Sequence, residues 1–371
     1  MKNKKVTTAL MTSMFAMGLI SNANSQTTIS GNLDLAYHAV SSNASSGGSY
    51  RAIGRETQIN IANKGKLSNG MDYAAGFSFE LDGGEQLGVS TSADSDSANA
   101  GNENVYIDFF YNKDSYISIS NDHVQNTDVT FTNLVGWGYL GGQGINNKTS
   151  LYPTSLNSSG YGIGISHLLP GFRVAGTFVP NPNKDGAPAN DTGHTLTSTA
   201  DSNMNARLEL TGRGDLGVKG LDVMIGYAQE DKDGVSNPTT SQDKKGHRVS
   251  AKYNFGQVTV AADYINSEGN NITHSGTTAT TTGNHELTGK SVGIAYAITP
   301  ALSVGYTRSQ AETNQAAALG LAKEKVNMYA VGYNLGPVTV QAQLRDAENV
   351  LGNTGANGEG EVFAVKLSTR F

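Results

Sequence analysis

The side chains that most often carry out chemistry in proteins are sparse in this chain and are not grouped for catalysis. The 371 residues include no cysteine, which excludes thiol nucleophiles, iron–sulfur clusters and cysteine-based zinc sites. No two of the seven histidines are three or four residues apart, and His285-Glu286 lacks the second histidine of a zinc protease motif. Ser166 and His167 are adjacent, so on a strand they would face opposite sides. We therefore expect no enzymatic activity, no catalytic metal and no cofactor.

Three short motifs have both a functional and a structural interpretation, and the structural one is favoured for each. Residues 136–141 match the glycine pattern of dinucleotide sites, but no helix-period segment follows to face a pyrophosphate. Residues 213–215 spell Arg-Gly-Asp, an adhesion tripeptide, but they fall where we expect a tight turn between two strands. Residues 94–96 (Asp-Ser-Asp) could supply oxygen ligands to calcium, although solvation of a polar loop is the simpler interpretation.

The N-terminus has the pattern of a secretory signal peptide over residues 1–25. Three lysines within residues 1–5 precede a mostly apolar run over 6–20, and small residues place cleavage after Ser25. A membrane anchor is the alternative, but a run of 15 residues is shorter than the about 20 that a spanning helix needs. Cleavage would leave residues 26–371, with 23 basic and 32 acidic side chains and a net charge of −9. This excess of acidic side chains does not indicate the basic surface that nucleic-acid binding requires.

Beyond residue 26, apolar residues recur at every second position, which is the period of a β-strand. Leu221, Val223 and Ile225, for example, share one face, while Asp222 and Met224 share the other. Sixteen segments have this division into an apolar and a polar face: 28–40, 55–63, 71–81, 104–111, 115–121, 159–167, 171–179, 204–213, 220–229, 246–255, 257–266, 287–297, 301–310, 324–334, 337–346 and 360–371. The chain is therefore predicted to be all-β.

The connections between these segments alternate between tight turns, such as 112–114 and 335–336, and long polar loops. Short turns at one rim and long loops at the other are typical of an outer-membrane barrel. A soluble β-sandwich has the same alternation. The even number of segments, their length near the about 9 to 11 residues of a bilayer crossing, and the absence of a linker favour the barrel. We predict a 16-stranded antiparallel transmembrane β-barrel with short periplasmic turns and long outer loops, formed by a single domain over residues 26–371.

A barrel of this size is too wide for side chains to fill, so its interior should hold water. By strand parity, the basic residues that face this interior are Arg173, Arg207, Arg248, Lys252 and Arg345. Arg207 and Lys252 fall nearest mid-strand and are the favoured pore-wall bases, although each base could instead pair with Glu209 or Asp263. The net charge of −9 favours a weak preference for cations.

The last strand, Glu361 to Phe371, alternates and ends in phenylalanine, and here the chain resembles the Gram-negative general porins. The opening strand at 29–33 and the hairpin at 67–80 extend this resemblance, which covers essentially all of the mature chain as a weak pattern. In that family the terminal residues are read by the outer-membrane assembly machinery, so the resemblance implies this role for Phe371. Thr369 departs from the pattern, since an aromatic or aliphatic residue is more common there.

The resemblance also implies that the third long loop, residues 122–158, folds into the pore and narrows it. The candidate constriction residues of this loop are Asp122, His123, Asp128, Trp137 and Tyr139. The loop departs from the acidic form of enterobacterial members, because its charged residues are Asp122, Asp128 and Lys148. A strong transverse electric field at the constriction is therefore not expected.

These expectations combine into one function, a water-filled channel for passive diffusion of small hydrophilic solutes and ions across the outer membrane. The partners would be outer-membrane lipid and lipopolysaccharide, and the resemblance implies a homotrimer. Two alternatives remain open. A substrate-selective channel would use aromatic side chains such as Tyr106, Phe110, Trp137 and Tyr139, whereas an adhesin or envelope tether would display its loops and carry no current.

Overall fold

The computed structural model describes most of the predicted strands and part of the third long loop. The described residues are 25–42, 49–82, 99–120, 123–124, 130–137, 161–179, 204–233, 244–269, 285–313, 322–350 and 358–371. The predicted signal peptide up to residue 24 and the Asp-Ser-Asp motif at 94–96 lie outside these ranges.

Sixteen strands form where the alternating pattern predicts them, which confirms the all-β fold. The first eight are β1 (Gln26–Ser42), β2 (Tyr50–Lys66), β3 (Asp72–Asp82), β4 (Asn99–Asn112), β5 (Ser115–Ser120), β6 (Gly162–Leu169), β7 (Phe172–Val179) and β8 (Met204–Gly214). The others are β9 (Leu221–Asp233), β10 (Lys244–Phe255), β11 (Val258–Gly269), β12 (His285–Ala297), β13 (Leu302–Thr313), β14 (Glu324–Asn334), β15 (Val338–Glu348) and β16 (Gly360–Arg370).

Several strands extend beyond the predicted ranges at the end that adjoins a long loop. β2 begins five residues earlier than predicted, at Tyr50, and β9 continues four residues further, to Asp233. The β9 extension consists of the charged residues Glu230-Asp231-Lys232-Asp233, whereas the β2 extension also includes Tyr50, Ala52 and Ile53. Alternation ends where the wall no longer contacts lipid, whereas backbone pairing continues, so polarity alone underestimates strand length.

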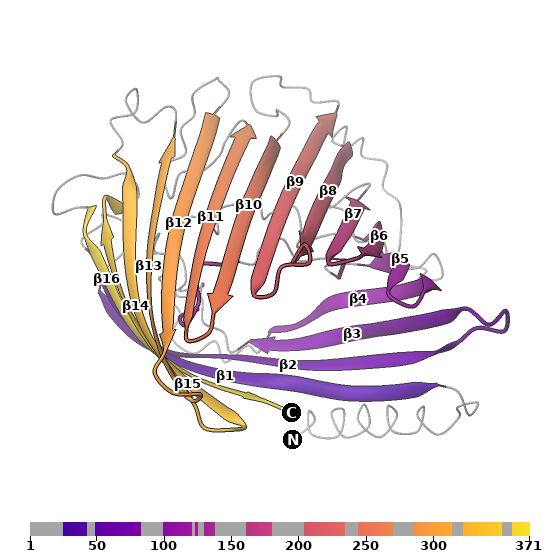
Figure 1. Ribbon diagram of the computed structural model, residues 1–371, viewed down its shortest axis with the longest axis horizontal. Helices are drawn as coiled ribbons and strands as arrows, with labels where there is room; N and C mark the ends of the chain where they lie inside the picture. The colour runs from indigo at the N-terminus through magenta and orange to yellow at the C-terminus, as the bar shows by residue number, and fades with distance from the viewer. Residues whose placement is uncertain are drawn as a thin grey trace.

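Each strand pairs antiparallel with its neighbours in sequence, and β16 pairs with β1, so the sheet closes into a barrel (Figure 1). At the closing seam Leu35 lies opposite Leu367, and Phe371 and Gly31 exchange two backbone hydrogen bonds of 2.9 and 3.0 Å. Closure pairs the backbone groups that lipid could not satisfy. Among the described residues, none forms a helix long and apolar enough to span a membrane.

The two faces of the barrel wall divide as the alternation predicts. Large apolar side chains cover the outer face, where Ile225 of β9 is 52% exposed and Ile294 of β12 is 48% exposed. The residues before them, Met224 and Gly293, face the interior and lie against the third long loop. Exposed aromatic side chains gather near the strand ends that meet the short turns, at Tyr111, Tyr253, Phe255, Tyr296 and Tyr333. This arrangement matches an apolar band bordered by an aromatic girdle.

Two of the short turns at the periplasmic rim share one hydrogen-bond pattern. Asn254 Oδ1 accepts from the N–H of Gly256 at 3.0 Å, and Asn334 Oδ1 accepts from the N–H of Gly336 at 2.8 Å. Both glycines have a φ of +88°, a left-handed conformation that glycine adopts without a steric penalty. An Asn-x-Gly sequence therefore ends one strand and reverses the chain into the next.

Candidate functional site

The connection between β5 and β6 enters the barrel, and its residues 131–137 lie against inward side chains of β11 to β15. The backbone N–H groups of Phe131 and Thr132 donate to the carboxylate of Asp263 at 3.2 and 2.9 Å. Thr132 Oγ1 donates to the same carboxylate at 2.8 Å. Asp263 lies on β11 and its side chain is fully buried, so this attachment is shielded from water.

Wall side chains also donate to the backbone carbonyls of the loop. Thr307 Oγ1 of β13 donates to the carbonyl of Thr132 at 2.6 Å, and Gln341 Nε2 of β15 donates to the carbonyl of Val135 at 2.5 Å. Because these bonds use loop backbone, they fix the path of the loop with little dependence on loop side chains.

Trp137 ends the described part of the loop and is attached through its backbone and its ring. Its N–H donates to Gln343 Oε1 at 3.1 Å, and its carbonyl accepts from the Arg345 guanidinium. The Lys366 ammonium lies 5.3 Å from the centroid of the indole ring, a cation–π contact. The ring also packs against an apolar cluster of Val40, Val326, Ala347, Val350, Val362 and Ala364.

Three wall glycines, which we call the glycine seat, make room for the loop. A Cβ at Gly293 would lie 2.6 Å from the carbonyl oxygen of Thr132, and a Cβ at Gly305 would lie 2.8 Å from Val135 Cγ2. A Cβ at Gly332 would lie 3.2 Å from Val135 Cγ1. Gly293, Gly305 and Gly332 lie on β12, β13 and β14, so the seat crosses three adjacent strands. The loop can approach the wall closely because these positions carry no side chain.

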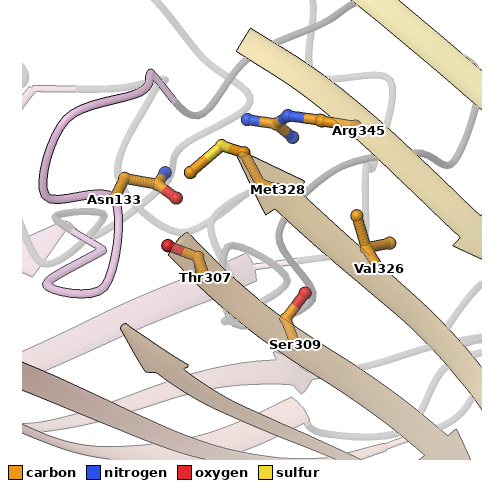
Figure 2. Close-up of a pocket in the computed structure, with 6 residues that line it drawn as sticks. All are labelled: Asn133, Thr307, Ser309, Val326, Met328 and Arg345. Carbon is orange, nitrogen blue, oxygen red and sulfur yellow. The ribbon is translucent and has the colours of Figure 1, made fainter. Parts of the chain in front are cut away.

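A crevice remains between the loop and the wall beside this seat. Figure 2 shows Asn133 extending from the loop toward Thr307 and Met328 on the wall. The remaining lining residues are Ser309, Val326 and Arg345. The crevice leaves no room for a water molecule, so the loop and the wall form one packed layer at this point.

Phe131 anchors the other end of this segment. It is buried and packs with Met224 and Ala261, which face inward from β9 and β11. Two cations cover its ring, since Arg213 Cζ and Lys252 Nζ lie 4.9 and 5.2 Å from its centroid. Burying the ring removes apolar surface from water and gives the loop a hydrophobic attachment in addition to its hydrogen bonds.

Arg213, Asp222 and Lys252 form the charged part of the wall at this anchor, which we call the Arg213 cluster. Arg213 donates twice to Asp222, at 2.8 and 3.1 Å, and Lys252 lies 3.5 Å from the same carboxylate. The side chains of Arg213 and Lys252 are 37% and 35% exposed. Two cations share one carboxylate, so the cluster presents one net positive charge to the lumen.

The family model described as Gram-negative porin matches residues 7–350. The chain belongs to the Gram-negative porin family. A sixteen-strand barrel of this family lies in the outer membrane. The family resemblance stated from the terminal strand is thereby confirmed.

Solved structures show the same fold for this porin at low sequence identity. It resembles the anion-selective porin from Comamonas acidovorans with a TM-score of 0.65 and 14% identity, covering 94% of this chain and 100% of that one. It also resembles a loop L8 deletion mutant of OmpT from Vibrio cholerae, with a TM-score of 0.61, 16% identity and coverage of 94% and 100%. It also resembles a triple mutant of the Rhodopseudomonas blastica porin, with a TM-score of 0.59 and 14% identity, covering 93% of this chain and 100% of that one. No curated protein sequence matches the chain.

The predicted pore-wall bases of the porin occupy different environments. Arg248 is fully buried and pairs with Asp263 at 3.1 Å. The sequence analysis had left this pairing open as the alternative to a free charge in the pore. Arg345 is buried under Trp137. Arg173 donates to Ser166 Oγ at 2.7 Å and to a turn carbonyl at 2.9 Å, near the periplasmic rim.

The two bases favoured from the sequence do not lie at mid-strand. Lys252 is three residues from the periplasmic end of β10, where it faces the lumen in the Arg213 cluster. Arg207 is the fourth residue of β8, toward its outer end, and its side chain lies outside the described part of the porin. Lys252 lies nearer the periplasmic end of its strand than the sequence indicated because β10 begins at Lys244, two residues before the predicted segment.

The predicted constriction residues are covered only in part. His123 and Trp137 contact the wall of the porin, whereas Asp122, Asp128 and Tyr139 lie outside the described residues. His123 Nε2 lies 2.9 Å from Asp108 Oδ2 on β4. Within the described ranges, no three potential ligand side chains are grouped to hold a metal ion.

Sequence reasoning missed Arg213 and Lys366 as lumen bases. Arg213 was assigned to a turn with the Arg-Gly-Asp motif, but β8 continues through Gly214 and only Asp215 enters the turn. Lys366 faces inward from β16 and pairs with Asp34 of β1 at 3.2 Å. Strand parity applied along the full length of β8 and β16 identifies both bases, since Arg213 alternates with the outward Leu208 and Leu210 and Lys366 with the outward Leu367.

Proposed function

We propose that this porin is a water-filled channel through which small hydrophilic solutes and ions diffuse passively. The observation that carries the proposal is the seating of residues 131–137 on the inner wall of a closed sixteen-strand barrel. A barrel of this strand number has an aqueous interior, and a loop fixed inside it reduces the cross-section without closing the barrel. The solute then meets a narrow, polar section, which supports size exclusion rather than chemistry.

Ion preference should be weak. The net charge of −9 after cleavage of residues 1–25 raises the local concentration of cations. The Arg213 cluster presents one net positive charge beside the loop, and most other charges of the described lumen are paired, as in Arg248 with Asp263. These opposing contributions support a small cation preference.

The proposal includes the setting in which the channel works. We infer a secreted single domain over 26–371, a homotrimer surrounded by outer-membrane lipid and lipopolysaccharide, and recognition of Phe371 by the assembly machinery. Phe371 supports the last point, because its ring is 66% exposed on the outer face, where a partner can reach it. None of these steps requires catalysis or a cofactor.

The test is the current of the purified, folded protein in a planar bilayer with unequal salt on the two sides. Discrete conductance steps with a small reversal potential of cation-selective sign are expected, and closure in groups of three steps would support the trimer. A silent membrane from folded protein would overturn the channel and favour a tether that displays its loops. A reversal potential of anion-selective sign would overturn the inferred preference alone.

A further inference from the structure

Four aromatic rings line one stretch of the lumen opposite the glycine seat. Tyr106 and Phe110 face inward from β4 and Tyr116 from β5, and His123 follows on the loop. Tyr106 and His123 are stacked, with ring centroids 3.6 Å apart and planes 4° apart. Tyr116 lies 6.3 Å from His123, and Phe110 lies 5.4 Å from Tyr116. We call Tyr106, His123, Tyr116 and Phe110 the aromatic track.

The upper end of the track is held in place by buried contacts. A Cβ at Gly76 would lie 2.8 Å from two atoms of the Tyr106 ring, so this ring rests on glycine backbone on one side. His123 covers the other side, and Asp108 holds the imidazole through the 2.9 Å contact with its Nε2. The Asp108 side chain is only 5% exposed, so it acts as a positioning residue and does not face the solute. Rings fixed in advance lose little freedom when a ligand stacks on them.

The track leads along the pore axis on the part of the wall that residues 131–137 do not cover. The contacts of these loop residues extend from β8 through β16 to β1, whereas the track lies on β4 and β5. Phe110 is two residues from the periplasmic end of β4, and Tyr106 is four residues further up the strand. Four residues of strand correspond to about 13 Å. All four residues are partly exposed, but Tyr106 lies between Gly76 and the imidazole, so the rings on which a passing solute can stack are those of His123, Tyr116 and Phe110.

Polar groups border the track on its β6 side. Tyr116 lies opposite Ser166, whose hydroxyl accepts a 2.7 Å hydrogen bond from Arg173. The track therefore combines flat apolar ring faces with adjacent hydroxyl and guanidinium groups. This pattern matches a solute that has an apolar C–H face and hydroxyl groups around its edge, as a pyranose ring has. An organic cation is a poorer match, because Asp108, the carboxylate that the described residues place at the track, is buried and already paired with His123.

We propose that the aromatic track is a binding site for neutral oligosaccharides that pass through the pore. The proposal rests on the channel function proposed above and names a solute class for it. Because the track is longer than one sugar ring, affinity should rise from glucose to maltotriose and then level off.

The experiment measures block of the ion current by maltotriose in a planar bilayer. Maltotriose is expected to give saturable block, and a polyethylene glycol of similar mass is expected to reduce current only in proportion to its concentration. Phe110→Leu and Tyr116→Leu should each raise the half-blocking concentration roughly five- to tenfold, since each loses one stacking face. Phe109→Leu is the matched control, because Phe109 lies beside Phe110 in β4 but pairs with Ile117 on the outer face.

The outcomes separate the two proposals. Normal salt current without saturable block by maltotriose overturns the track and leaves the channel intact. Equal effects of Phe109→Leu and Phe110→Leu also overturn it, as does saturable block by phenol but not by maltotriose. A folded protein without salt current overturns the channel itself. Asp108→Asn provides a second measurement, because a displaced His123 should weaken maltotriose block while salt conductance persists.

Discussion

The glycine seat makes a sharp prediction for Gly293→Ala. The new Cβ would lie 2.6 Å from the carbonyl oxygen of Thr132 and 3.2 Å from its Cα, and loop backbone cannot rotate away as a side chain end can. Overpacking of this kind typically costs about 1–3 kcal/mol. Four of the hydrogen bonds that hold the loop here are three to Asp263 and one from Thr307, and Thr132 Oγ1 also forms a 2.7 Å hydrogen bond with Ser291 Oγ.

These four bonds decide the direction of the effect. At about 0.5–1.5 kcal/mol each, they contribute about 2–6 kcal/mol together, which exceeds the cost of the clash. We therefore expect the loop to stay docked but to shift toward the pore axis. Single-channel conductance should fall and open-channel noise should rise, while the barrel should still fold, because no strand pairing is lost.

The matched control is Gly332→Ala. Its Cβ would lie 3.2 Å from Val135 Cγ1 and Ser303 Oγ, and both atoms are side chain ends that can rotate. Conductance of this variant should fall less than that of Gly293→Ala, because these side-chain atoms need to move by only a few tenths of an ångström. If Gly293→Ala conducts like the wild type, or if both variants lose conductance equally, the tight seating of the loop on the wall is refuted.

Three further predictions concern charge and assembly. The double variant Arg213→Gln, Lys252→Gln should shift the reversal potential toward cation selectivity in dilute salt, and less so at high salt, where charges are screened. Lys290→Gln is the control, because Lys290 is exposed on the outer face and its replacement should not shift the reversal potential. Arg248→Met should lower the free energy of unfolding by about 3–5 kcal/mol, because the buried carboxylate of Asp263 loses the positive charge that it pairs with. Lys245→Met, which removes one partner of an exposed ion pair, is the control and should leave the melting temperature unchanged. Phe371→Ala should reduce the amount of folded protein in outer membranes but not refolding in detergent; equal yields in membranes would contradict its role in recognition.

Much of the wall could be predicted because a two-residue period leaves little choice. Leu221, Val223 and Ile225 fix one face of β9 regardless of what the neighbouring strands do. The positions of the strand ends were harder to predict. Arg213 was assigned to a turn because Gly214 and Asp215, which follow it, have turn propensity. Pairing of β8 with β7 through Gly214 overrode that local preference.

The site itself could be predicted only in outline. Parity indicates that Gly293, Gly305 and Gly332 face inward, but a glycine in a strand does not reveal what approaches it. The contact between Thr132 and Asp263 joins residues 131 positions apart, and no local pattern marks it. Resemblance to porins placed the loop in the lumen, whereas the choice of wall strands depends on three-dimensional packing.

The long separation between the loop and its seat also imposes an order of events in time. Phe131 and Asp263 are 132 residues apart, and Val135 and Gln341 are 206 apart. Neighbouring strands close short hairpins at little entropic cost, but the seat does not exist until β11 to β15 have paired. The loop can therefore dock only after these strands have paired, and a barrel that closes before docking is not yet narrowed. During that interval it is a wider opening than the finished channel, so the speed of docking sets how long each new molecule leaves the envelope leaky.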